Sequence, residues 1–200
     1  MEINELQQLF TTLPGPYTLS IGREYIPAMD TPRRQAFPEA NHNGTNRDIY
    51  DDRAWHLTVH LADELAAYSR LIPGPDGFFK ALTANPLLAD SAAATDWSRL
   101  VVPAFFRGLR LSKVMGLAAL VVARALGGRY VHGAANPERQ LVKLLYQLEF
   151  EAVSLPASVS VQPGISFRLQ LLTCDLTRLS YVPEERLTDS WCELGVASMT

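Results

Sequence analysis

RGLRLSKVMGLAALVVARALGG, residues 107–128, places an arginine-containing loop directly before a long apolar segment. From Leu111 to Leu126 the leucines, valines and alanines fall on more than one helical face, and the pattern stops at a pair of glycines, which favour a helix end. The apolar run from Val114 to Leu126 contains Arg124 and is shorter than the roughly 18 residues needed to cross a bilayer. We therefore expect a core helix of a globular domain and no membrane span.

Strand and helix signals lie on both sides of this helix. Trp55–Leu61 and Leu65–Ile72 read as two strands of a hairpin joined by a short polar turn. The other expected elements are a helix or loop at 87–94, strands at 100–102, 129–133, 150–155 and 165–173, and a helix at 137–148 with Asn136 as N-cap and Pro137 in the first position. This order predicts a single α/β (α+β) domain in which helices flank a central sheet.

The composition is that of one ordinary domain, with 200 residues, 48% hydrophobic content and a net charge of −3. This charge gives no reason to expect nucleic-acid binding. Prolines divide residues 1–47, which we expect to be a mobile or partly helical segment ahead of a core at 48–200. The N-terminus lacks the pattern of a signal peptide, and Cys174 and Cys192 lack CxxC spacing, so we expect a cytoplasmic protein with reduced thiols.

The segment from Arg107, together with ANPERQLVKLLYQLEFEAV at residues 135–153, resembles the Gcn5-related N-acetyltransferase (GNAT) superfamily. Members of that superfamily carry a loop RGxGxG or QxxGxG between a strand and a helix, and NPxxxxLYxxLGF further on. The resemblance implies a mixed, mostly antiparallel sheet. It also implies that N–H groups at the start of the helix receive the pyrophosphate or phosphopantetheine of an acyl thioester.

Within that superfamily the chain resembles the acyl-homoserine-lactone (autoinducer) synthases, which make quorum-sensing signals. Those enzymes carry an arginine followed four residues later by phenylalanine, a DxxD pair, a strand ending in Arg-Leu, an ExSR motif before a strand, and a helix opening ISxVMxLA. The corresponding residues are, in the same order, Arg33 with Phe37, Asp48 with Asp51, Arg70 in YSRL, Asp96 with Arg99 in DWSR, and Leu111–Ala118 in LSKVMGLA.

The resemblance implies an acyltransferase that moves a fatty acyl group from acyl carrier protein or CoA to the α-amine of S-adenosylmethionine, whose carboxylate then closes a lactone. It places Asp96 as the general base, with Arg99 as the second catalytic residue. The implied amine-substrate-binding residues are Arg33, Phe37, Asp48, Asp51 and Arg70. The implied acyl- and phosphopantetheine-binding residues are Val101, Val102, Arg107, Arg110, Ser112, Phe78, Phe79 and Leu145.

The expected partners follow from charge and from the acyl donor. Acyl carrier protein is acidic, so a basic patch is a candidate docking surface, with CoA as the alternative donor; the patch comprises Arg107, Arg110, Lys113 and Lys143. We expect no permanently bound cofactor. We also expect no metal, because His56 and His60 lie four apart on a strand, a separation of about 13 Å.

Several positions depart from the two patterns. Asn46 and Asp96 stand where autoinducer synthases carry glutamate, and Leu145 stands where many acetyltransferases carry a general-acid tyrosine. Arg110 and Ser112 replace the later glycines of the superfamily loop. Two alternatives therefore stay open: an N-acyl amino acid synthase, or another N-acyltransferase of this fold, and a binding module that has lost catalysis. The charged residues also fit a purely structural ion-pair network.

Overall fold

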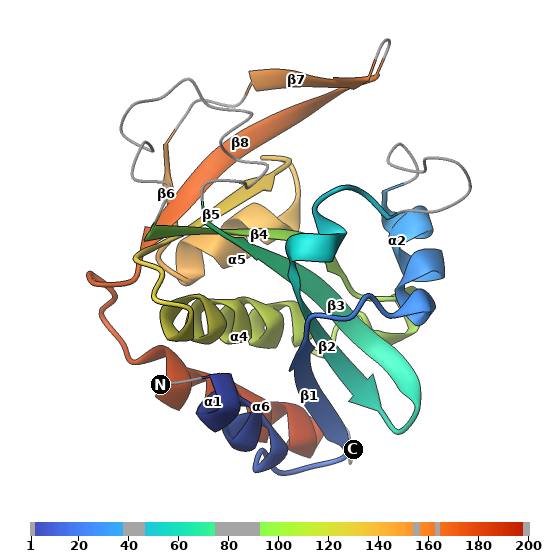
Figure 1. The fold of residues 1–200 in the computed structure, drawn as a ribbon, viewed down its shortest axis with the longest axis vertical. Coiled ribbons are helices and arrows are strands. Elements are labelled where there is room, and N and C mark those ends of the chain that lie inside the picture. Colours follow the sequence, from blue (N-terminus) through green and yellow to red (C-terminus); the bar gives the residue numbers. More distant parts are fainter. Residues whose placement is uncertain (1–2, 38–46, 75–92, 154–156, 163–164, 198–200) are drawn as a thin grey trace.

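A mixed sheet forms the centre of the molecule, with helices packed on its faces (Figure 1). The structure is a computed structural model that describes residues 3–37, 47–74, 93–153, 157–162 and 165–197. The strand order is β1-β2-β3-β4-β5-β8-β6, and β7 also pairs with β8. The strands are β1 Tyr17–Gly22, β2 Trp55–Leu61, β3 Glu64–Pro73, β4 Ala94–Val101, β5 Tyr130–Ala135, β6 Glu151–Ala152, β7 Ala157–Gln162 and β8 Ile165–Asp175. Every pair is antiparallel except β4–β5, as the predicted fold requires.

The helices lie on opposite faces of this sheet. They are α1 Ile3–Thr11, α2 Asp30–Ala36, α4 Leu111–Ala125, α5 Gln140–Gln147 and α6 Pro183–Ala197, with short 3-10 turns η1 Pro27–Met29, η3 Asp51–Arg53 and η6 Ala104–Phe106. Leu71 and Trp97 share the main core with α4, whereas Tyr68, on the opposite side of β3, packs with Met29 of η1. Side chains alternate along a strand, so α4 covers one face and the η1–α2 segment the other. None of the helices among these described ranges is long and apolar enough to cross a membrane.

Helix α4 is the centre of the main core. All residues from Val114 to Ala123 are buried, because β2, β3 and β4 cover one side of the helix while α1 and α6 cover another. This enclosure explains why apolar residues occur on more than one helical face. The helix is followed by Gly127, whose φ of +77° gives the left-handed conformation that favours glycine after a helix, as predicted.

Residues 1–47 contain a strand that the sequence did not suggest. Residues 17–22 form β1, an edge strand whose burial alternates and which pairs with His56–Leu61 of β2. The prolines upstream and downstream obscured this short alternation, so only partial helix was expected for residues 1–47.

Other boundaries also differ from the prediction. Strand β4 begins at Ala94, six residues before the predicted start. Helix α5 begins at Gln140, because the Asn136 Oδ1 atom accepts a hydrogen bond from the Glu138 N–H at 2.9 Å and forms a turn rather than a cap. Strand β6 has only two residues, and β7 and α6 had no predicted counterpart. The predicted helix or loop at 87–94 lies mostly outside the described residues.

The parallel pair β4–β5 separates soon after it begins. Its paired positions are Ala94 with Tyr130, Thr95 with Val131, and Asp96 with His132. Beyond them β4 continues to Val101 paired with β3, and β5 continues to Ala135 paired with β8. The two strands therefore diverge after Asp96 and His132, and beyond these residues β4 and β5 no longer pair with each other.

The packing of α4 against β4 depends on the lack of a side chain at Gly116. A Cβ atom there would lie 2.4 Å from Leu148 Cδ1 and 3.2 Å from the Trp97 ring, and both of those side chains are buried. Overpacking a core costs about 1–3 kcal/mol, more than the roughly 1 kcal/mol that alanine gains over glycine in a helix. We expect Gly116→Ala to lower the free energy of unfolding, measured by urea denaturation.

Gly22 provides the matched control, because a Cβ at that position meets no atom within 4 Å. Gly22→Ala should leave the free energy of unfolding within about 0.5 kcal/mol of the wild type. Equal stabilities for Gly116→Ala and the wild type would contradict the proposed close contact.

Candidate functional site

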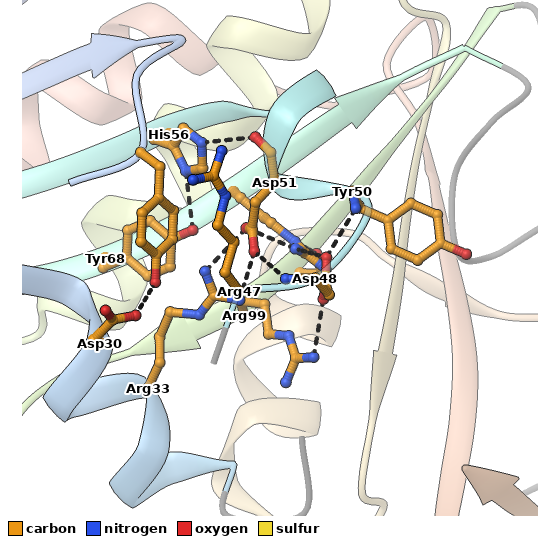
Figure 2. A network of polar contacts seen from close by, with 12 residues as sticks. Asp30, Arg33, Arg47, Asp48, Tyr50, Asp51, His56, Tyr68 and Arg99 are labelled. Atoms are coloured by element: carbon orange, nitrogen blue, oxygen red, sulfur yellow. Dashed lines mark hydrogen bonds and ion pairs between the residues drawn. The ribbon is translucent and has the colours of Figure 1, made fainter. Parts of the chain in front are cut away.

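A cluster of arginines and aspartates lies on the sheet face opposite α4 (Figure 2). Its members come from four parts of the chain, and they are Arg33 of α2, Asp48 and Asp51 of the turn before β2, Arg70 of β3 and Arg99 of β4. We call these five residues the ion cluster. The predicted amine-binding motifs, which are far apart in the sequence, thus meet at one place.

Asp51 is the buried centre of the ion cluster, with a side chain that is 0% exposed. Arg33 binds it with both terminal nitrogens, Nη1 to Oδ1 at 2.9 Å and Nη2 to Oδ2 at 3.1 Å. Arg70 Nη1 donates to Oδ1 at 2.7 Å, and the Asp48 backbone N–H donates to Oδ2 at 2.8 Å. Two-point pairing of this kind is the strong form of an arginine–carboxylate contact, so Asp51 holds α2 and β3 together.

Asp48 is the more accessible carboxylate, with a side chain that is 17% exposed. Arg70 binds both of its oxygens, at 2.6 and 2.9 Å, and Arg99 Nη2 donates to Oδ2 at 3.1 Å. The Tyr50 N–H donates to Oδ1 at 2.9 Å, which closes the local turn. Of the two aspartates predicted to contact an amine, Asp48 is therefore the one that solvent reaches.

Arg99 owes its position to a bulge in β4. The pairing of Tyr68 with Val101 and of Arg70 with Ser98 leaves one extra residue on β4, and Arg99 there has a φ of +57°. A bulge redirects the side chain that it carries. The Arg99 guanidinium lies 4.9 Å from the centre of the Phe37 ring and within reach of Asp48, so the bulge joins the predicted Arg-Phe and DWSR motifs.

The charges of the ion cluster determine its protonation. Burial by itself raises the pKa of Asp48, but the hydrogen bonds and charge of Arg70, together with the charge of Arg99, outweigh burial and lower it to about 2. Burial also raises the pKa of Asp51, but the hydrogen bonds and charge of Arg33 and the charge of Arg70 outweigh burial. The pKa of Asp51 is therefore lowered. Both carboxylates are ionised at neutral pH. Three guanidinium groups then face two carboxylates, so the cluster carries one net positive charge.

A second layer of polar contacts supports Asp51, and sequence reasoning missed it. His56 lies between the Tyr68 hydroxyl, 3.0 Å from Nδ1, and the Asp51 carbonyl oxygen, 3.1 Å from Nε2. The carbonyl can only accept, so Nε2 donates to it and Nδ1 accepts from the tyrosine. Burial lowers the pKa of His56 and keeps this imidazole neutral. The predicted hairpin could have identified His56, because the pairing of its two strands places His56 opposite Arg70.

Asp96, the predicted base, lies beside the ion cluster rather than within it. Its residue is 6% exposed, and its strand register places it between Ile72 of β3 and His132 of β5. Ser98, which accepts a hydrogen bond from Arg70 Nε at 3.0 Å, is two residues further along β4. Residues two apart on a strand share a face and are separated by about 6.6 Å. Asp96 thus stands on the same face as the ion cluster, at the point where β4 and β5 diverge.

The predicted acyl-binding residues fall into different environments. Val101 is buried and Val102 is half-buried, and Arg107 Nε donates to the Val102 carbonyl at 3.3 Å across the loop. Gly108 and Arg110 have φ values of +91° and +59°, so the loop makes its sharp turns there before Ser112 enters the first turn of α4. Leu145 is 2% exposed and belongs to the main core. Phe78 and Phe79 lie outside the described residues.

The predicted basic patch is partly neutralised. Arg110 Nη1 lies 3.0 Å, and Lys113 Nζ 4.0 Å, from Glu193 Oε2 on α6. Arg107 is exposed on the loop, and Lys143 is exposed on α5. Beside them Phe105 is 82% exposed. Within the part of the chain that the structure describes, no group of acidic, histidine and cysteine side chains is placed to hold a metal ion.

The bulge in β4, the diverging β4–β5 pair and the loop before α4 define the fold as that of the Gcn5-related N-acetyltransferases. Solved structures bear out this assignment. The N-acetyltransferase from Staphylococcus aureus Mu50 is 13% identical, and the match has a TM-score of 0.61 and covers 80% of this chain and 98% of that one. No family model and no curated protein matches the sequence.

Structures of autoinducer synthases are also similar to this chain, as the sequence resemblance predicted. The AHL synthase LasI is 14% identical with a TM-score of 0.61, over 82% of this chain and 91% of that one. BjaI, a CoA-dependent acyl-homoserine lactone synthase with MTA, is 18% identical with a TM-score of 0.59, over 86% of this chain and 90% of that one. At these identities the likeness establishes the fold.

The ion cluster should give the protein a characteristic response to acid. A folded-state pKa of about 2 for Asp48, against an ordinary 3.8, corresponds to roughly 2 kcal/mol of stability that is present above pH 4 and is lost as the pH falls toward 2. We expect Asp48→Asn to be less stable than the wild type at pH 7. The difference should shrink as the pH falls from 4 to 2, because the wild-type carboxylate then becomes neutral too.

Urea denaturation at pH 7, 4 and 3 measures this difference. Asp63→Asn, in the exposed turn between β2 and β3, is the matched control and should stay within about 0.5 kcal/mol of the wild type at each pH. A gap between Asp48→Asn and the wild type that does not change with pH would show that the ion pairs of Asp48 do not stabilise the fold.

Proposed function

We propose that this protein is an acyltransferase that moves an acyl group from a thioester to the amine of an amino-acid-like acceptor. The observation that carries the proposal is the position of the ion cluster and of Asp96 on one sheet face, where β4 and β5 diverge. An acyl thioester that enters between the diverging strands would bring its carbonyl close to an amine held at the cluster. Proximity of this kind is a large part of catalysis in a two-substrate reaction.

The cluster is suited to an acceptor that carries both a carboxylate and an amine. Arg33 and Arg70 are committed to the aspartates, with side chains 0% and 3% exposed. The Arg99 side chain is 18% exposed, and it is the cation that an entering carboxylate would meet. Asp48 next to it offers a carboxylate to the acceptor ammonium. An α-amino acid group has both charges at this spacing, so we assign Arg99 and Asp48 to its recognition.

S-adenosylmethionine is the acceptor that we put forward first, which makes the product an N-acyl-homoserine lactone. The motif order from Arg33 to Leu111–Ala118 supports this choice, and so does the likeness to LasI and BjaI. An N-acyl amino acid synthase is the second candidate. The observation that favours it is the net positive charge of the ion cluster, which attracts a carboxylate but does not favour an additional sulfonium cation.

CoA is the acyl donor that we put forward first, with acyl carrier protein as the alternative. Two of the similar structures are described as CoA-dependent synthases, MesI and BjaI. The pairing of Arg110 and Lys113 with Glu193 also lowers the positive charge that an acidic carrier protein would meet. The loop before α4 would hold the pyrophosphate of CoA by its backbone N–H groups and by Arg107.

Labelling in cells tests the acceptor. We would feed carboxyl-labelled methionine to cells that express the chain and analyse lipid extracts by mass spectrometry against an empty-vector control. Labelled acyl-homoserine lactone is the expected product. Unlabelled N-acyl amino acids would instead identify the second candidate. No new acyl-amine in cells, together with no thiol release from acyl-CoA or acyl carrier protein by the purified protein, would contradict acyl transfer and favour a binding module.

Asp96 should act in turnover rather than in binding. The acceptor ammonium must lose a proton before its nitrogen attacks the thioester, and we assign the removal of this proton to the Asp96 carboxylate, where β4 and β5 diverge. We expect Asp96→Asn to lower kcat by about 10²-fold or more, with KM for both substrates within a few-fold of the wild type. Steady-state kinetics measure both constants, and circular dichroism checks the fold. A kcat near that of the wild type would remove Asp96 as the base.

A further inference from the structure

Four polar residues on four neighbouring strands form one row across the sheet. The register places Asp96 of β4 opposite His132 of β5, His132 opposite Thr173 of β8, and Thr173 opposite Glu151 of β6. Residues that pair directly across strands share a face, and adjacent strands lie about 4.8 Å apart. We call these four residues the polar row. It starts at the predicted base, Asp96, and ends at Glu151 on the edge strand β6.

Burial decreases along the polar row. Asp96 and His132 are 6% and 5% exposed, Thr173 is half-buried and Glu151 is exposed. His132 Nδ1 lies 3.0 Å from the Thr173 hydroxyl oxygen, so at least this step of the row is a direct hydrogen bond. The Tyr130 ring lies nearly parallel to the imidazole, with 6.3 Å between the two ring centroids. The row therefore combines this hydrogen bond with two neighbour pairs set by strand register, Asp96 beside His132 and Glu151 beside Thr173, and all four groups carry exchangeable protons or accept them.

Acyl transfer to an amine needs such a route. The acceptor enters as an ammonium; its nitrogen forms a bond with the acyl carbon while the carbon–sulfur bond breaks. Of the two protons that the nitrogen gives up, one goes to the departing thiolate and the other must leave the site in each turnover. Asp96 can take that second proton, but it must be returned to the carboxylate form before the next cycle.

We propose that His132 and Thr173 relay this proton from Asp96 toward Glu151 at the surface. The inference rests on the proposed acyl transfer and assigns the path by which its base is reset. An imidazole suits the task because it accepts a proton at one ring nitrogen while it releases one from the other. Thr173 passes a proton through its hydroxyl in the same way.

Electrostatics also favour this direction. On the other side of Asp96 lie Arg70 and Arg99 of the ion cluster, whose net charge is positive and repels a proton that would leave past them. Burial lowers the pKa of His132 to about 4, so the imidazole is neutral at pH 7 and passes a proton on rather than storing it. Glu151, which is exposed, gives the proton a carboxylate from which it reaches water.

Kinetics of purified variants, with the donor and acceptor on which the wild type is most active, test the relay. We expect His132→Gln, which keeps a polar group of similar size but cannot carry a proton through a ring, to lower kcat about 10- to 100-fold with KM unchanged. Thr173→Val, which replaces the hydroxyl with a methyl group of similar size, should lower kcat in the same direction. Added imidazole should restore part of the rate to His132→Ala but none to Asp96→Asn.

His60→Gln is the matched control, because His60 is a half-buried histidine of β2 outside the polar row, and it should keep the wild-type kcat. Values of kcat within twofold of the wild type in both His132→Gln and Thr173→Val would overturn the relay while leaving acyl transfer intact. A loss of kcat that follows a lower melting temperature and is not rescued by imidazole would also overturn it, by assigning His132 a structural role. Absence of acylation by the wild type itself would overturn the proposed function, and the relay with it.

Discussion

The buried contact of Asp51 with Arg33 and Arg70 is the interaction on which the site depends. These side chains are almost fully removed from water, and desolvating ions costs several kcal/mol for each ion unless the pairing is nearly complete. Here two-point pairing from Arg33, a second guanidinium from Arg70 and the Asp48 backbone N–H satisfy the carboxylate. Loss of one partner would leave an uncompensated buried charge, which typically lowers the free energy of unfolding by about 3–5 kcal/mol. The contact thereby holds α2 and the turn before β2 against β3.

The same constraint explains how a regular sheet comes to gather charged side chains on one face. Arg70 is fixed by the aspartates, and its Nε reaches Ser98, so β4 must lie in register there. The extra residue of the bulge then falls at Arg99, whose positive φ turns its guanidinium toward Asp48 and Phe37. Past Asp96 and His132, β4 stays with β3 while β5 stays with β8. The divergence of the two strands and the position of the ion cluster are thus linked through the register of β4 on β3.

Sequence reasoning succeeded where a local pattern determines structure. The helix after Arg110 is a long apolar segment that ends at two glycines, and the hairpin of β2 and β3 is two apolar segments joined by a polar turn; both appear as predicted. Strand β1 was missed because its alternation covers only six residues between prolines, and the start of α5 was misplaced because Asn136 makes a turn as readily as a cap. The motifs named the members of the ion cluster, since each has a characteristic neighbour in the sequence. An ion-pair network was one of the readings that the sequence left open, but the sequence did not indicate which arginine meets which aspartate. The contact of Arg99 with Asp48 depends on the bulge at Arg99, for which the sequence DWSR contains no glycine or other marker.

His56 and His132 show most clearly what a linear pattern omits. Neither belongs to a recognised motif in the sequence, yet each is buried next to a member of the site through strand pairing, His56 opposite Arg70 and His132 opposite Asp96. Their burial lowers both pKa values, so both imidazoles are neutral at pH 7 and neither adds to the positive charge of the ion cluster. Their surroundings nevertheless differ. His56 is held at both ring nitrogens by groups of the fold, the Tyr68 hydroxyl and the Asp51 carbonyl, and so braces the position of Asp51. His132 is hydrogen-bonded to a hydroxyl that can both accept and donate a proton, on a row that ends in solvent. The same residue type at the same depth of burial therefore fixes geometry in one place and is suited to move a proton in the other.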